Sequence, residues 1–286
     1  MRNPVMPASG TFGYGTEYAG LVDIGRVGAV VTKGVTLVPW DGNPQPRIWE
    51  TASGMLNSIG LENIGVDAVI RDKAPIWATW STPVIVNVAG QTIDEYVGVA
   101  SRLDGVDGVA GLEINISCPN VSAGGIEFGL STRSAATLTR AVRDATSLPL
   151  IVKLSPNVRN IVPIATAVVD AGADSICVAN TLRGTAIDVK RRCFRLGRSS
   201  GGLSGPAIKP IALHMVYAAA HAVHAPVIGC GGIATAEDAL EFIMAGATAV
   251  QVGTATFTDT CSMEDVVRGL EDFATRRGIR SLDEIR

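Results

Sequence analysis

The sequence has 286 residues, of which 47% are hydrophobic and 18% charged, so it holds enough apolar side chains for a large buried core. The net charge is −3 and 5% of the residues are aromatic, so we expect neither a nucleic-acid partner nor binding to an anionic membrane surface. Apolar runs are too short to predict a membrane span or a signal peptide.

Short apolar runs rich in β-branched residues alternate with segments of helical period. The expected strands are residues 5–7, 29–32, 84–88, 112–116, 150–154, 175–179, 227–229 and 249–252. Segments of helical period lie between the strands, for example residues 66–77, 93–103, 135–145, 161–171, 208–223, 236–245 and 263–276. Eight such units predict an α/β fold, a (β/α)8 TIM barrel formed by residues 1–286 as one domain. An open doubly wound sheet is the alternative, but its early G-x-G-x-x-G is absent.

Two long excursions interrupt the alternation. Residues 34–65 are rich in proline and glycine, and residues 182–205 are rich in arginine. We expect both to be long loops that serve as lids or binding surfaces.

The five cysteines are odd in number and widely spaced, with no C-x-x-C pair. This pattern predicts no disulfide framework, no metal site and no iron–sulfur cluster in the chain. A reducing, cytoplasmic location suits it best. Cys177 and Cys230 lie in apolar strands, where we expect them to pack as small hydrophobic side chains.

In a barrel of this kind the active site lies at the carboxyl ends of the strands. Gly231-Gly232 and Gly253-Thr254 follow the last two expected strands, where small residues let backbone N–H groups approach a phosphate. Tight turns alone could also explain either pair.

Lys33 and Lys153 end strands that otherwise read as buried, and a buried ammonium needs a partner. The partner could be an anionic cofactor ring, or a carbonyl substrate that forms a Schiff base as in an aldolase.

Amide side chains and one thiol complete the set at the strand ends. An asparagine side chain both donates and accepts hydrogen bonds, which suits the edge of an amide-rich heterocycle. The asparagines are Asn57, Asn87, Asn115, Asn120 and Asn180. Cys118 follows a buried strand and could act as a base or nucleophile near neutral pH. No histidine stands in a papain-like arrangement with it, which disfavours a Cys–His hydrolase.

Several segments together resemble the class 1 dihydroorotate dehydrogenases. They are residues 3–13, 32–34, 54–61, 115–120, 201–207 and 229–233. Residues 120–129 are more similar to the NAD-linked, heteromeric class 1B than to the fumarate-linked homodimer. The resemblance implies FMN bound at the mouth of the barrel and oxidation of dihydroorotate to orotate in pyrimidine biosynthesis.

The resemblance also implies roles for individual residues. Cys118 would be the catalytic base, and Lys153 would stabilise the negative charge that develops on the flavin. The implied FMN contacts are Ser9, Lys33, Gly34, Asn87, Asn115, Lys153, Ala179, Gly205, Gly231, Gly232, Gly253 and Thr254. The implied substrate contacts are Lys33, Asn57, Ser58, Ile59, Gly60, Leu61, Asn115, Asn120, Asn180 and Thr181.

The resemblance implies partners as well: a homodimeric core and a separate subunit that carries FAD and an iron–sulfur cluster and passes electrons to NAD. Three alternatives stay open at this point. They are a fumarate-linked homodimeric dihydroorotate dehydrogenase, a Schiff-base aldolase that uses Lys153, and a phosphate-binding barrel without catalytic activity.

Overall fold

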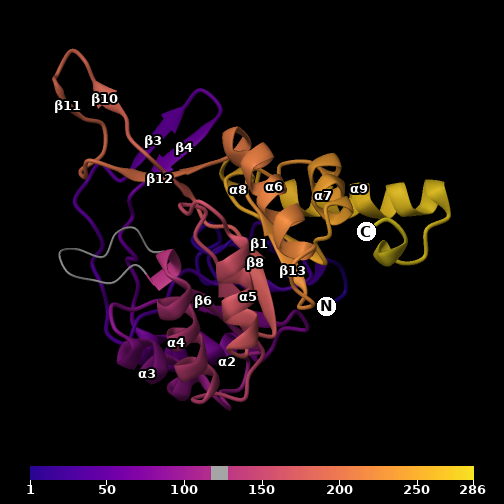
Figure 1. Cartoon of the computed structure of the whole chain (residues 1–286), viewed down its shortest axis with the longest axis horizontal. Coiled ribbons are helices and arrows are strands. Elements are labelled where there is room, and N and C mark those ends of the chain that lie inside the picture. The colour runs from indigo at the N-terminus through magenta and orange to yellow at the C-terminus, as the bar shows by residue number, and fades with distance from the viewer. Residues whose placement is uncertain (117–127) are drawn as a thin grey trace.

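Eight parallel strands form one sheet that curls into a barrel, with helices around it (Figure 1). The computed structural model describes residues 1–116 and 128–286. In their order around the sheet the strands are β1 (Val5–Pro7), β14 (Ala249–Val252), β13 (Val227–Cys230), β8 (Ser175–Val178), β7 (Leu150–Lys153), β6 (Gly111–Asn115), β5 (Val84–Val88) and β2 (Val30–Val31). The backbone N–H of Gly28, just before β2, donates to the carbonyl of Val5 in β1 at 2.8 Å. The two ends of the sheet therefore meet, and the predicted (β/α)8 barrel is confirmed.

The helices overlap the predicted segments with one division, and residues 255–258 add a short helix that the helical period does not predict. They are α1 (Val66–Asp72), α2 (Ala74–Trp77), α3 (Ile93–Leu103), α4 (Thr132–Arg143), α5 (Val162–Asp170), α6 (Lys209–Ala220), α7 (Ala236–Met244), α8 (Ala255–Thr258) and α9 (Ser262–Arg277). Single-turn 3-10 helices are η1 (Ile24–Arg26), η2 (Phe128–Leu130), η3 (Pro206–Ile208) and η4 (Leu282–Glu284). The single helix expected over residues 66–77 is divided at Lys73, because Pro75 cannot continue a helical hydrogen-bond ladder but fits the first turn of a new helix.

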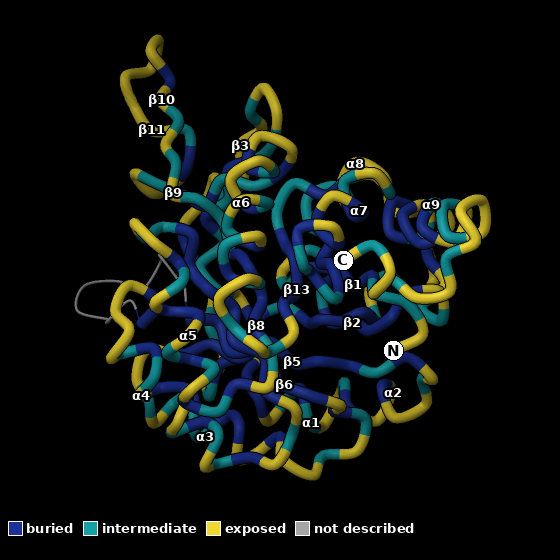
Figure 2. Tube along the Cα trace, turned by 45° about the vertical axis from the view of Figure 1, so that its right-hand side comes forward, coloured by how far each residue is buried: buried dark blue, intermediate teal, exposed yellow. Residues whose placement is uncertain are grey.

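Side chains alternate between the two faces of each strand, and the two faces have different contents. The outer face packs against the helices in the larger of two apolar clusters. The inner face forms a smaller cluster inside the barrel, made of Met6, Ala8, Ala29, Val31, Ile85, Ile151, Cys177, Ile228, Cys230 and Ala249. Figure 2 shows the barrel strands as the most deeply buried part of the chain. Two positions beyond Ile85, Ile151 and Ala249 come polar side chains, so the barrel interior changes from apolar to polar toward its carboxyl end.

The two excursions expected as loops contain strands, so that expectation is wrong. They join in an antiparallel sheet with the order β3 (Ile48–Thr51), β4 (Gly54–Asn57), β12 (Gly201–Ser204) and β9 (Leu182–Gly184). Beyond β9, β10 (Ile187–Asp188) pairs with β11 (Cys193–Phe194) and projects away from the barrel (Figure 1). The strands are short and glycine-rich, and β4 pairs with a strand about half the chain away, so local sequence patterns do not show them. Thr254, just after β14, donates to Ser204 Oγ of β12 at 2.7 Å, which places this sheet beside the carboxyl ends of the barrel strands.

Candidate active site

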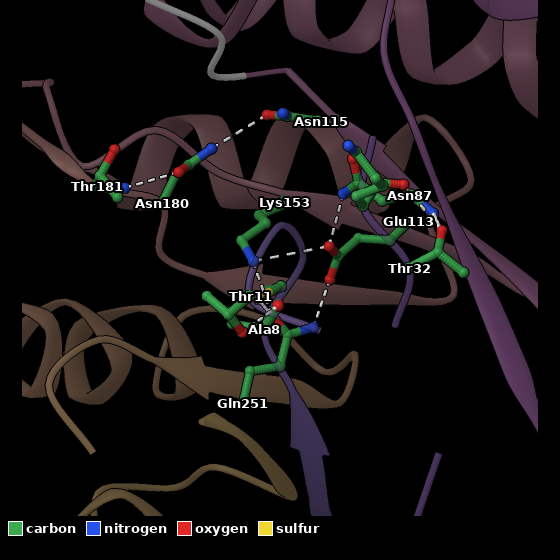
Figure 3. Close-up of polar contacts among 12 residues, drawn as sticks. Ala8, Thr11, Thr32, Asn87, Glu113, Asn115, Lys153, Asn180, Thr181 and Gln251 are labelled. Atoms are coloured by element: carbon green, nitrogen blue, oxygen red, sulfur yellow. Dashed lines mark hydrogen bonds and ion pairs between the residues drawn. The ribbon is translucent and has the colours of Figure 1, made fainter. Parts of the chain in front are cut away.

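A buried polar network crosses the inside of the barrel at the carboxyl ends of its strands (Figure 3). Lys153 of β7 donates through Nζ to Gln251 Oε1 of β14 at 2.7 Å. Gln251 Nε2 in turn donates to Glu113 Oε2 of β6, and Asn87 Nδ2 of β5 donates to Glu113 Oε1 at 2.7 Å. Lys153 Nζ also lies 3.7 Å from Glu113 Oε1, so the network contains a buried ion pair. Four strands thereby hold one ammonium group in place at the barrel mouth.

The charge on Lys153 is favoured by its surroundings despite its burial. Burial opposes the ammonium form, but the neighbouring Cys230 and Glu113 outweigh this effect and raise the pKa of Lys153. A neutral amine is the nucleophile that a Schiff-base enzyme needs, so this environment disfavours the aldolase alternative.

The two cysteines expected as inert packing residues are buried as predicted, but they border this network. Cys177 Sγ lies 3.4 Å from Gln251 Oε1. A hydrogen bond from Cys177 lowers the pKa of Cys230 to about 7, while burial opposes the shift and the charge of Lys153 adds to it. Cys230 therefore contributes to the electrostatics around Lys153 rather than only to packing.

Glu113 and Gln251 are absent from the residues predicted as site residues. Both are fully buried, and each stands in the middle of an apolar strand. That position is itself a signal, because a carboxylate inside a buried strand requires partners in the folded protein. Thr32 was likewise missed; its Oγ1 accepts from the backbone N–H of Asn87 at 3.2 Å and fixes that strand end.

A second group of amides lies at the ends of β6 and β8. Asn180 Nδ2 donates to Asn115 Oδ1 at 3.1 Å, and the Asn180 Oδ1 accepts from the backbone N–H of Thr181 at 2.8 Å (Figure 3). Tyr96 Oη donates to the Asn115 carbonyl at 2.6 Å and fixes the backbone there. Of the residues predicted to contact substrate, Asn115, Asn180 and Thr181 are thus brought together.

The predicted substrate segment from Asn57 to Leu61 begins in β4 and continues beyond it. Asn57 Nδ2 donates to the carbonyl of Gly202 in β12 at 3.4 Å. Asn43 supports the next two residues: its Nδ2 donates to the Ser58 carbonyl at 3.1 Å, and its backbone N–H donates to the Ile59 carbonyl at 2.9 Å. Arg198 Nε donates to Asn43 Oδ1 at 3.2 Å. One arginine of the basic excursion therefore holds the asparagine that contacts this segment.

The segment lies close to the end of β2. A Cβ atom built on Gly34 would lie 3.2 Å from Leu61 Cδ2 and 3.3 Å from Asn87 Oδ1, which places these three residues side by side. Gly60 packs still more closely on Asn43, because a Cβ atom built on it would lie 2.6 Å from the Asn43 backbone nitrogen. Lys33 is half-buried, its backbone N–H donates to the Gly13 carbonyl at 2.7 Å, and its Nζ lies 5.8 Å from the centre of the Tyr14 ring.

The predicted phosphate residues also converge. A Cβ atom on Gly232 would lie 2.9 Å from the Gly205 carbonyl and 2.8 Å from the Lys209 backbone nitrogen, and φ of Gly232 is +76°. Only glycine combines that backbone with so close an approach. A Cβ atom on Gly205 would lie 3.6 Å from Thr254 Cγ2, so the turns after β12, β13 and β14 meet.

Three other predicted FMN contacts lie at strand ends in the same region. Ala179 follows β8, and its backbone N–H donates to the Cys230 carbonyl at 2.9 Å, next to Gly231. Ser9 is half-buried in the turn after β1, where Thr11 Oγ1 donates to the Ala8 carbonyl at 2.8 Å. Gly253 faces this turn, because a Cβ atom built on it would lie 3.4 Å from Ala8 Cβ. Cys118 and Asn120 lie outside the described residues.

No helix among the described residues is long and apolar enough to cross a membrane. Within the same residues, His, Cys, Asp and Glu side chains form no group of three or more that could hold a metal ion.

Comparisons with known proteins show the family of the chain. The family model for dihydroorotate dehydrogenase matches residues 1–274. The chain is 55% identical over 285 residues to the protein named "Dihydroorotate dehydrogenase B (NAD(+)), catalytic subunit" of Geotalea uraniireducens, covering 100% of this chain and 93% of the relative. The proteins of the same name from Geobacter metallireducens and Desulforamulus reducens are each 54% identical over 285 residues, covering 100% of this chain and 93% and 94% of the relatives. The chain belongs to the dihydroorotate dehydrogenase family.

Proposed function

We propose that the chain is the FMN-dependent catalytic subunit that oxidises dihydroorotate to orotate in pyrimidine biosynthesis, with NAD as the final electron acceptor. The observation that carries the proposal is the buried ammonium of Lys153, held at the barrel mouth beside the amides of Asn87 and Asn115. The names of the relatives support the substrate and the NAD-linked class.

The residues at the mouth fit an FMN molecule. Asn87 Oδ1 is buried and accepts no hydrogen bond from the described residues, so it is available to a ligand. The closely packed turns at Gly205, Gly232 and Thr254 offer backbone groups and a hydroxyl at the place where barrels bind phosphate. Lys153 supplies the fixed positive charge that an anionic ring system requires. We propose that residues 1–286 act as one FMN-binding domain, with the twelve FMN contacts predicted from the sequence.

FMN, when bound, supplies the acceptor for the hydride that leaves the substrate. The contribution of Lys153 is electrostatic: its charge is in place before the reaction and stabilises negative charge that develops beside it. The four-strand network keeps the ammonium fixed, so little reorganisation is needed during the reaction.

Dihydroorotate is a carboxylate with a planar run of ring amides, and the proposed substrate residues match both features. Lys33 is half-buried and can pair with the carboxylate. The Asn57, Asn115 and Asn180 side chains can donate to and accept from the ring amides. The buried Ser58 Oγ has no hydrogen-bond partner among the described residues and is a further candidate donor.

Cys118 is the proposed base that removes the proton from C5 of dihydroorotate. In the sequence Cys118 stands three residues after Asn115, which is one of the proposed substrate contacts. Asn120 is proposed as a further substrate contact on the same segment.

The electron acceptor lies beyond this chain in the proposal. We propose a homodimer of this chain with an electron-transfer subunit that carries FAD and an iron–sulfur cluster. The name "catalytic subunit" of the relatives agrees with a divided enzyme.

The test of the proposed function compares acceptors. The purified chain is expected to be yellow with a flavin spectrum, and together with its electron-transfer subunit to reduce NAD with dihydroorotate. Rapid fumarate-dependent turnover by the chain alone would contradict the NAD-linked assignment, and a colourless protein that binds no FMN would contradict the flavoenzyme.

A further inference from the structure

Glu113 is the one buried carboxylate in the polar network under the barrel mouth, and the proposed function gives it no role. Both of its oxygens accept hydrogen bonds, one from Asn87 and one from Gln251, and one of them lies 3.7 Å from Lys153 Nζ. Its side chain is completely buried. Its charge therefore acts on Lys153 with little screening by water.

Glu113 also fixes the orientation of the Gln251 side-chain amide. A carboxylate only accepts hydrogen bonds, so the Gln251 end that faces Glu113 must be the NH2 group. The other end, Oε1, is thereby turned toward Lys153 Nζ, from which it accepts at 2.7 Å. A neutral side chain at position 113 would allow the opposite orientation, which would aim an NH2 group at the ammonium and remove its anchor.

Stability alone does not explain a buried carboxylate and ammonium at this position. Taking two charges out of water is costly, and well-packed apolar side chains of similar volume are often equally or more stabilising. The neighbouring layer of the barrel interior is indeed apolar, with Ile85, Ile151 and Ala249 one pleat below. The pair stands only at the carboxyl end of the barrel, where active sites of this fold lie.

We propose that Glu113 is a positioning residue that fixes and balances the charge of Lys153 and thereby sets how strongly the site favours reduced over oxidised FMN. This inference rests on the proposed function, because it assumes that FMN binds above Lys153. With Glu113 in place, the pair is neutral, and the ammonium stabilises the anionic reduced flavin only partially. A site of this kind stabilises reduced FMN only moderately over oxidised FMN, so transfer of the electrons to the next carrier stays favourable.

The other titratable groups that face Lys153 from the described part of the chain are Cys177 of β8 and Cys230 of β13. Burial raises the pKa of Cys177, whereas Cys230 titrates near pH 7. The measurement is therefore made at pH 6, below the pKa of Cys230, where both thiols are largely protonated in the wild-type protein.

The experiment measures the reduction potential of bound FMN in wild type, Glu113→Gln and the control Glu271→Gln. Glu271 is an exposed residue of α9 whose contact with Arg26 is a surface ion pair, so its change tests a glutamate-to-glutamine substitution away from the barrel. Removing the buried anion is expected to raise the ratio of affinities for reduced over oxidised FMN by at least tenfold, which for two electrons is about 30 mV toward positive potential. The control is expected to match wild type.

A second comparison keeps the test decisive if Glu113→Gln alone does not fold. Lys153→Met leaves a bare buried carboxylate, and the double variant Lys153→Met/Glu113→Gln replaces the pair by neutral groups. Because Glu113 acts through Lys153, and a buried carboxyl group without its counter-ion takes up a proton, the double variant is expected to have the same potential as Lys153→Met.

Equal potentials for Glu113→Gln and wild type, or a tenfold difference in the affinity ratio between the double variant and Lys153→Met, would overturn the inference while leaving the proposed function intact. A wild-type protein without FMN would overturn the proposed function and this inference with it.

Discussion

Asn180 and Asn115 are joined by a hydrogen bond of 3.1 Å that connects the ends of β8 and β6 across the intervening β7. Each amide fixes the orientation of the other, and the Asn180 Oδ1 is held by the backbone of Thr181. A pair of amides locked in this way presents a fixed pattern of donors and acceptors, which favours one orientation of a planar ring.

Substitution of Asn180 by alanine tests this pair. The change removes one amide and frees the other, so we expect the KM for dihydroorotate to rise about tenfold, the effect of roughly 1.4 kcal/mol of lost interaction. The FMN content is expected to stay unchanged, which flavin absorbance against protein absorbance measures. Asn160→Ala, an exposed position at the start of α5, is the matched control. An unchanged KM in Asn180→Ala would remove Asn180 from the substrate site.

Gly253 offers a test of the cofactor site that leaves the fold intact. A methyl group at this position would meet Ala8 Cβ at 3.4 Å and Thr11 Cγ2 at 3.7 Å, which are ordinary contacts, so Gly253→Ala is expected to fold normally. It would fill space that the proposal gives to FMN, and we expect the Kd for FMN to rise by about tenfold or more, as measured by fluorescence titration of the flavin-free protein. Gly20→Ala, where a Cβ atom meets nothing within 4 Å, is the control. Equal affinities in the two variants would place FMN elsewhere.

Lys153→Met is expected to destabilise the flavin-free protein. The substitution leaves Glu113 as a buried charge without its counter-ion, a situation that costs about 3–5 kcal/mol in the free energy of unfolding. Urea unfolding of the variant measures the loss, with the exposed Lys190→Met as control. A loss below about 1 kcal/mol, the size of a surface ion pair, would show that the buried pair is not formed.

The carboxyl group of Asp238, in the first turn of α7, is expected to make the free energy of unfolding depend on pH. Burial would raise its pKa, but Lys209 and the backbone N–H groups of Ala234 and Thr235 outweigh this and lower it. Because the folded pKa is the lower one, the stabilisation is complete above the unfolded value and is lost as the pH falls through the folded value. Asp238→Asn, which weakens the cap of α7, is expected to cost about 1 kcal/mol at pH 7 and progressively less below pH about 4.

Unfolding experiments at several pH values check this prediction, and the neighbouring exposed Glu237→Gln is the control. A difference between wild type and Asp238→Asn that stays constant from pH 7 to about pH 2 would contradict it.

The sequence patterns predict the barrel well because each strand is a local run. β1, β5 and β14 agree with the predicted bounds, and α3 does so among the helices. The antiparallel sheet formed by β3, β4, β12 and β9 could not be predicted, for a physical reason. β4 pairs with β12, and a local sequence pattern carries no information about pairing between segments so far apart in the chain. Pro75 likewise divides at Lys73 a helix that hydrophobic period alone would continue.

Only the site residues at strand ends could be predicted from the sequence. The residues at strand ends, such as Lys153 and Asn180, follow from the rule that barrel sites lie at carboxyl ends. Glu113 and Gln251 stand inside strands, and their importance depends on distances between strands that only the folded chain supplies. A rule that marks every charged residue within a buried strand would have found Glu113.

The most direct test of the account follows the flavin absorbance on anaerobic addition of dihydroorotate. Wild-type protein is expected to be yellow and to lose its absorbance near 450 nm, about the flavin maximum, as orotate forms. Cys118→Ala is expected to be equally yellow but to bleach at least about a hundredfold more slowly, because the proposed base is absent. A wild-type protein that stays yellow with dihydroorotate, or a Cys118→Ala protein that bleaches at the wild-type rate, would contradict the account.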